Sequence, residues 1–166
     1  MQSKYLGTID LDGGVGGGAM DASITYNGSA LQVRLEIDYP GRLENTDHFG
    51  ETTIDDVDNV LGNLDFIDGL ARTTIATGIA RIGTAAEQMF TAWMRNNDRD
   101  ADEKHAFLHG LRPTKLTITP DGGKINRDRV VMSYGLVDRS VNGTVTVRFV
   151  EPTGPELAPA PRGGYS

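Results

Sequence analysis

The chain has 166 residues, a formal net charge of −7 and no cysteine. This length predicts one domain with its own core, and the lack of cysteine excludes a disulfide framework, a thiolate nucleophile and a Cys-ligated zinc site. The first residues, MQSKYLGTIDLD, lack the apolar segment of a signal peptide, and no run approaches the roughly 18 apolar residues of a membrane helix. We therefore expect a soluble, cytoplasmic protein.

Three short runs near the N-terminal end predict strands: KYLGTIDL, ASITY and ALQVRLEI. In the third run, apolar and polar residues alternate from Leu31 to Ile37, and this period of two predicts one buried and one solvated face. The second and third runs are separated by Asn27-Gly28-Ser29, which favours a tight hairpin because Asn and Gly tolerate positive φ angles. Together the three runs predict a meander.

The middle of the chain changes to a helical period. Thr53 with Asp56 predicts the start of a first helix, which continues through Leu61. A second helix follows, because apolar residues recur there at helical spacing. These residues are Ile67, Leu70, Ala71, Ile75, Ile79 and Ile82.

A Thr-x-x-Glu capping box, formed by Thr84 and Glu87, predicts the start of a third helix. Phe90 and Trp93 lie on its apolar face and are expected to pack in the core rather than form a binding platform. The stretch EKHAFLHG predicts a short fourth helix that ends with Gly110 in the C′ position.

The last third of the chain returns to strands, with the runs LTIT, VVMSYGLV and TVTVRFV. Residues 1–151 are therefore predicted to form one α+β domain, in the order β-β-β-α-α-α-β-β-β. We expect an antiparallel sheet of about six strands with about three to four helices packed on one face. Residues 152–166, PTGPELAPAPRGGYS, are rich in proline and have little to bury, so a flexible tail is expected.

The stretch DLDGGVGGGAMD contains the spacing Gly14-x-Gly16-x-x-Ala19 of a dinucleotide-binding fingerprint. That fingerprint requires a helix directly after it, because the helix N-terminus supplies the amide donors that hold pyrophosphate. The following residues, MDASITYNG, instead predict a strand. We interpret the stretch as a hairpin connection and expect no nucleotide cofactor.

Two histidines, His105 and His109, stand four residues apart on the fourth predicted helix, so both imidazoles would lie on one face. Two ligands do not complete a metal site, and a third would have to come from elsewhere, for example from His48 or Asp102. The sequence also contains no Gly-x-Ser-x-Gly elbow or other convincing catalytic motif. We therefore assign no catalytic residues, metal or cofactor.

One segment, from Glu44 to Asp68, contains many acidic residues and no Lys or Arg. Such a segment argues against binding of nucleic acid, whose phosphates need Lys and Arg, and favours a basic protein partner. The alternative is a solvated helix face whose carboxylates lie near positive helix N-terminal dipoles. The residues that we predict to bind the partner are Glu51, Asp55, Asp56, Asp58, Asp65 and Asp68.

The order of elements suggests a resemblance. A meander ending in LQVRLEIDY is followed by the acidic stretch TIDDVDNVLGNLDFIDGLAR and by the closing strands VVMSYGLV and TVTVRFV. In this layout, over residues 4–150, the chain resembles small bacterial α+β proteins of unknown function, some of which are similar to immunity proteins of polymorphic or contact-delivered toxins. The resemblance implies a cytoplasmic binding protein rather than a catalyst, and it assigns no functional residues.

We consider two hypotheses for the function. In the first, the protein is a non-enzymatic binding module of the immunity type, whose acidic segment covers a basic surface such as the nucleic-acid cleft of a toxin. In the alternative, it is a structural or assembly component of a phage or secretion machine. Its glycine-rich loop and proline-rich tail would then become ordered on contact with neighbouring subunits.

Overall fold

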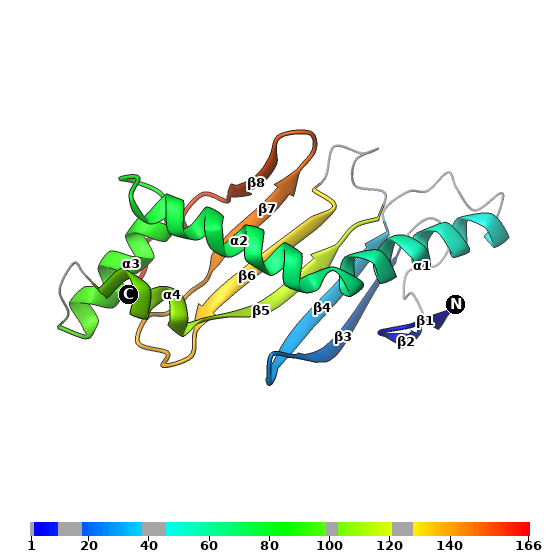
Figure 1. Cartoon of the computed structure of the whole chain (residues 1–166), viewed down its shortest axis with the longest axis horizontal. Coiled ribbons are helices and arrows are strands. Elements are labelled where there is room, and N and C mark those ends of the chain that lie inside the picture. Colours follow the sequence, from blue (N-terminus) through cyan, green and yellow to red (C-terminus); the bar gives the residue numbers. More distant parts are fainter. Residues whose placement is uncertain (1, 10–17, 38–45, 99–102, 121–127) are drawn as a thin grey trace.

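The computed structural model describes residues 2–9, 18–37, 46–98, 103–120 and 128–166. The elements are, in order, β1 (Gln2–Ser3), β2 (Gly7–Thr8), β3 (Gly18–Tyr26), β4 (Ser29–Ile37), α1 (Thr46–Gly62), α2 (Leu64–Ile79), α3 (Ala85–Asn96), α4 (Lys104–Gly110), β5 (Leu111–Ile118), β6 (Val130–Leu136), β7 (Val145–Val150) and β8 (Gly154–Leu157). Helix α2 crosses one face of the sheet, with α1 at one end and α3 and α4 at the other (Figure 1). The predicted α+β class is confirmed.

The main sheet is mixed rather than antiparallel. Its six strands lie in the order β3-β4-β5-β6-β7-β8, and β4 and β5 run parallel while the other neighbours are antiparallel. Parallel neighbours need a long crossover connection, which the four helices between β4 and β5 provide. The predicted order of elements is also corrected, because the run KYLGTIDL contributes to the separate β1–β2 hairpin and not to the main sheet.

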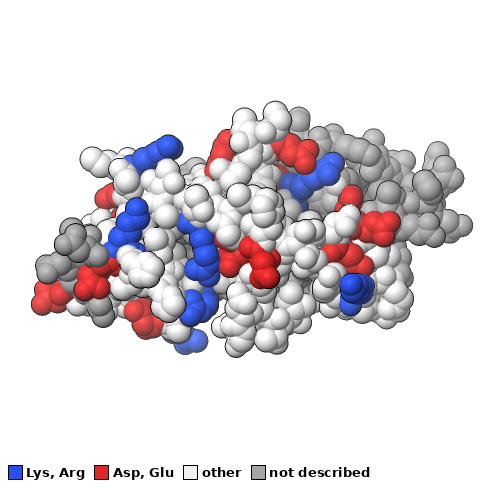
Figure 2. Space-filling view, in the orientation of Figure 1, with Lys and Arg blue, Asp and Glu red and all other residues white. Residues whose placement is uncertain are grey.

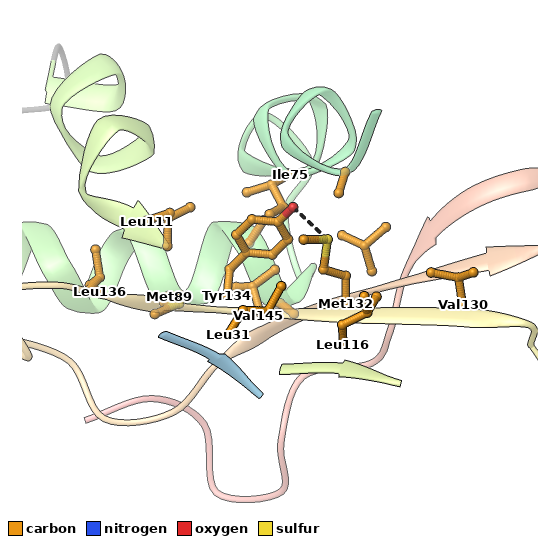
Figure 3. Close-up of a cluster of buried hydrophobic side chains, with 14 of the residues drawn as sticks. Leu31, Ile75, Met89, Leu111, Leu116, Val130, Met132, Tyr134, Leu136 and Val145 are labelled. Carbon is orange, nitrogen blue, oxygen red and sulfur yellow. Dashed lines mark hydrogen bonds between the residues drawn. The ribbon is translucent and has the colours of Figure 1, made fainter. Parts of the chain in front are cut away.

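The core lies between the sheet and the helices. On β4, the predicted alternation is confirmed, since Leu31, Val33 and Leu35 are buried while Gln32 is exposed. Figure 3 shows how side chains of β4, β5, β6 and β7 meet Ile75 of α2 and Met89 of α3 in one apolar cluster. The opposite face of the sheet carries mainly polar residues, as expected for a sheet that is covered on one side only.

The predicted hairpin between β3 and β4 is confirmed. Tyr26 and Ser29 are paired across the strands, and the two residues between them, Asn27 and Gly28, have φ angles of 48° and 77°. Positive φ at both central positions is the signature of a type I′ turn, which matches the twist of the two strands.

The predicted helices differ in how well their ends agree with the structure. The N-cap of α3 at Thr84 is confirmed, because the Glu87 N–H donates to Thr84 Oγ1 at 3.1 Å, but the Glu87 carboxylate accepts the N–H of Gly83 and not that of Thr84. In contrast, Gly110 is the last residue of α4 and not its C′ residue, since the chain enters β5 directly at Leu111. Ile82 is 97% exposed because α2 ends at Ile79, so it does not extend the apolar stripe.

The C-terminal segment packs against the domain, in contrast to the flexible tail expected for residues 152–166. Residues of β8 pair with β7, and Tyr165 is buried, with its hydroxyl donating to the carbonyl oxygen of Thr144 at 2.8 Å. The Asn142 N–H donates to the carbonyl oxygen of Ser166 at 2.9 Å. The domain therefore includes this segment. The buried side chain of Tyr165 holds it in place, and the proline content of the segment does not predict this contact.

Candidate protein-binding surface

The predicted acidic residues lie on α1 and α2, in different surroundings. Asp55, Asp56 and Asp65 are exposed, Asp58 is half-buried and Asp68 is buried. The side chain of Glu51 lies outside the described part of the structure, although its backbone belongs to α1. Since α1 begins at Thr46, Asp55 to Asp58 lie well inside the helix, so the helix dipole does not explain them.

Asp58 holds the N-terminal hairpin against α1. Its Oδ1 accepts a hydrogen bond from Ser3 Oγ at 2.5 Å, and its Oδ2 accepts one from the backbone N–H of Lys4 at 2.9 Å. Ser3 Oγ in turn accepts the N–H of Leu6 at 3.0 Å. Both carboxylate oxygens of Asp58 are therefore engaged within the chain, which gives this residue a structural role.

Asp68 is the centre of a buried hydrogen-bonded network. Its Oδ1 accepts the hydroxyl of Tyr134 on β6 at 2.6 Å and the Nε of Arg72 at 3.0 Å. The two terminal nitrogens of Arg72 donate to the carbonyl oxygens of Leu108 and Leu111 at 3.2 and 3.1 Å. The network thus ties α2 to the middle of the sheet and to the junction of α4 and β5, and a buried charge that is paired in this way is part of the scaffold.

Asp65 has one partner within the described residues, the hydroxyl of Tyr26, which donates to Asp65 Oδ1 at 2.8 Å. Burial and the hydrogen bond to Asp65 raise the pKa of Tyr26 above its ordinary value. Burial and the hydrogen bond to Asp68 likewise raise the pKa of Tyr134. Both phenols therefore stay protonated at neutral pH and serve as hydrogen-bond donors that join the sheet to α2.

Asp55 and Asp56 are the carboxylates that remain available. Both are exposed, and neither forms an ion pair or a side-chain hydrogen bond within the described part of the chain. Figure 2 shows acidic side chains over α1 and the start of α2, whereas most basic side chains on this face lie toward α3 and α4. Acidic side chains also lie near α3 and α4, and some basic side chains lie on the α1 side, so the face carries charges of both signs along its length.

An apolar groove of about 460 Å³ lies beside Asp56. Its walls include Val60 of α1, Leu70 of α2 and Phe149 of β7, and Glu151 lies at its polar margin together with Arg129. The side chain of Phe66 lies one helical turn before Leu70 and is 68% exposed. Exposed apolar side chains next to a groove are typical of a site that contacts another molecule.

The groove could not be predicted from the sequence, because its walls come from segments far apart in the chain. The one available signal was Leu70, which widens the predicted apolar stripe of α2; in the structure it is 36% exposed at the groove. The i,i+4 spacing of Asp68 and Arg72 also predicts an ion pair. Nothing in the spacing predicts that the hydroxyl of Tyr134 also donates to Asp68.

A second, polar pocket of about 290 Å³ lies between the β3–β4 turn and the end of α4, and its lining includes Arg72, His109 and Arg112. The Nη1 of Arg112 donates to the carbonyl oxygens of His109 and Leu111 at 2.7 and 2.9 Å. Since Arg72 also binds two carbonyl oxygens and Asp68, the guanidinium groups hold the chain at the end of α4. The described residues that line this pocket include no serine, threonine or cysteine.

The other candidate sites of the sequence analysis find no support in the described residues. His105 and His109 are both exposed, and the described residues contain no group of three or more potential ligands that could hold a metal ion. Ala19 lies in strand β3, so the helix that a dinucleotide-binding fingerprint needs does not follow the glycine-rich stretch; Gly14 and Gly16 lie outside the described residues. Among the described residues, none of the helices combines the length and the apolar composition that a membrane span requires.

Comparison with protein family models, with curated proteins and with solved structures gives no significant match.

Proposed function

We propose that the protein is a non-enzymatic protein-binding module that receives a basic partner on its acidic side, formed by α1 and the start of α2. The observation that carries this proposal is the position of Asp55 and Asp56, two exposed carboxylates that have no cationic partner among the described residues, on the helix that borders the apolar groove. Charge of one sign accelerates encounter with a basic partner. The groove then offers a place for an apolar side chain, which provides binding energy that exposed charges alone do not.

The chemistry of the surface defines the partner. A matching segment carries Lys or Arg toward Asp55 and Asp56 and an apolar side chain toward Leu70 and Phe149. A toxin that acts on nucleic acid would present such a basic surface, and covering it would block its activity, which is how an immunity-type protein works. The net charge of −7 supports a basic protein and not a phosphate backbone as the target.

The alternative role as an assembly component relied in part on a tail that becomes ordered between subunits. In the structure, Tyr165 and β8 pack within their own chain. The C-terminal segment therefore no longer favours that role, and the binding module is the better-supported proposal.

A matched pair of double variants tests the proposal. Asp55→Asn with Asp56→Asn removes the proposed contacts, whereas Asp98→Asn with Glu156→Gln removes two exposed carboxylates elsewhere and changes the net charge equally. The partner is captured from cell extract at low salt, identified and purified, and its affinity for each variant is measured by isothermal titration calorimetry.

We expect the first pair to weaken binding about tenfold at low salt, and we expect this difference to shrink as salt screens the charges. The control pair should bind as the wild type does. Equal weakening by both pairs, or an affinity that does not respond to salt, would contradict the proposal.

A further inference from the structure

The two edges of the main sheet differ in how they are protected. At one edge, β8 has four residues and contains Pro155, which has no N–H to offer a further strand. At the other edge, β3 has nine residues with neither Pro nor Lys, and it pairs with β4 along its whole length without a bulge. Among the described strands, β4 is its only neighbour. A long, regular edge of this kind is a template for another strand.

The turn at Asn27-Gly28 decides which backbone groups of β3 face the free edge. Tyr26 and Ser29 close this turn, so they form a hydrogen-bonded pair, and the even-numbered residues of β3 bond with β4. The backbone N–H and C=O groups of the odd-numbered residues therefore point outward. These residues are Ala19, Asp21, Ser23 and Thr25. They are placed symmetrically about Ala22.

We propose that β3 pairs antiparallel with β3 of a second copy of this chain, with Ala22 on the twofold axis. Because the outward-facing residues are symmetric about Ala22, this register gives each of their N–H and C=O groups a partner. On the face that carries the helices, Met20 then lies opposite Ile24 of the second copy. Both side chains are only half-buried in the single chain, so pairing removes further apolar surface from water.

The charges of β3 select the same register. Asp21 is the only charged residue of this strand, and Arg34 on β4 binds it at 2.9 Å. With Ala22 on the axis, Asp21 lies opposite the neutral Ser23 of the second copy. A register centred on Asp21 would place this carboxylate opposite Asp21 of the second copy. A register centred on Ser23 would place Ala19 opposite the turn of the second copy, beyond the end of its strand.

A single introduced cysteine tests this register, because the chain has none of its own. Ala22 would face its copy in a non-hydrogen-bonded pair, in which the Cα atoms are about 4.5 Å apart and within the range of a disulfide. Under mild oxidation, the Ala22→Cys variant should form a covalent dimer. Thr25→Cys, on the same strand, should not, because Thr25 lies opposite Ala19. A failure of Ala22→Cys to cross-link while folded, or equal cross-linking of both variants, overturns the proposal.

The dimer itself is measured by analytical ultracentrifugation over a concentration series. Ser23 is exposed, so Ser23→Asp and Ser23→Lys change the proposed contact with Asp21 of the second copy without disturbing the core. By symmetry the contact occurs twice, and Ser23→Asp should raise the dimer Kd about tenfold while Ser23→Lys lowers it. A wild-type protein that stays monomeric, or a dimer Kd that neither substitution changes, overturns the proposal. This test does not depend on the function proposed above.

Discussion

Replacement of Asp68 by Ala should destabilise the fold strongly, because it removes the acceptor at the centre of a buried network. Asp68 is 7% exposed, and its carboxylate accepts hydrogen bonds from both Tyr134 and Arg72. Breaking a buried ion pair by removing one partner costs about 3–5 kcal/mol. The Arg72 side chain is 30% exposed and recovers some hydration, so we expect a loss of about 2–4 kcal/mol of unfolding free energy.

A double-mutant cycle isolates the hydrogen bond between Tyr134 and Asp68. Tyr134→Phe alone removes a donor to a charged acceptor and should cost about 1.5–3 kcal/mol. In the Asp68→Ala background the hydroxyl has already lost that acceptor, and it keeps only the contact with Met132 Sδ at 3.2 Å that Figure 3 shows. The second substitution should then cost little, which corresponds to a coupling energy of about 1.5–2 kcal/mol.

Urea unfolding followed by circular dichroism provides the measurement, with stability read from the midpoint at an unchanged m value. Asp56→Ala is the control, since this exposed side chain has no partner within the described residues and should stay within about 0.5 kcal/mol of the wild type. Additive effects of the two network substitutions, or a cost of less than about 1 kcal/mol for Asp68→Ala, would refute the assignment of Asp68 to the scaffold.

Two further predictions follow from the hydrogen bonds of the scaffold. Asp58→Ala should release the β1–β2 hairpin from α1, because both of its oxygens are engaged there. The expected cost is about 1–2 kcal/mol, measured as faster hydrogen exchange at the Lys4 and Leu6 amides, and unchanged exchange would refute it. Folding raises the pKa of Tyr134, so its contribution to stability is complete below the unfolded value of about pH 10 and is lost as the pH rises above it, at up to about 1.4 kcal/mol per pH unit. Tyr134→Phe should show a shallower alkaline decline in urea unfolding, and an identical slope would contradict the argument.

Much of the local structure could be predicted because its cause is local. The alternation from Leu31 to Ile37 predicted the buried face of β4, and the capping box at Thr84 predicted the start of α3. In both cases neighbouring residues determine the outcome. The C-terminal segment shows the limit, since its packing depends on one aromatic residue, Tyr165, that finds a site on another part of the chain.

The acidic segment shows the same division between local and tertiary causes. The sequence by itself determined that the segment from Glu44 to Asp68 contains no Lys or Arg, and that most of its carboxylates lie on helices, because charge and helical periodicity are properties of adjacent residues. Only the tertiary structure decided that Asp68 is buried under Tyr134, that Asp58 binds the N-terminal hairpin, and that Asp55 and Asp56 remain exposed. The physical reason is that hydrogen-bond partners and burial come from segments distant in sequence: Tyr134 comes from β6 of the main sheet, and Ser3 and Lys4 come from the separate N-terminal hairpin.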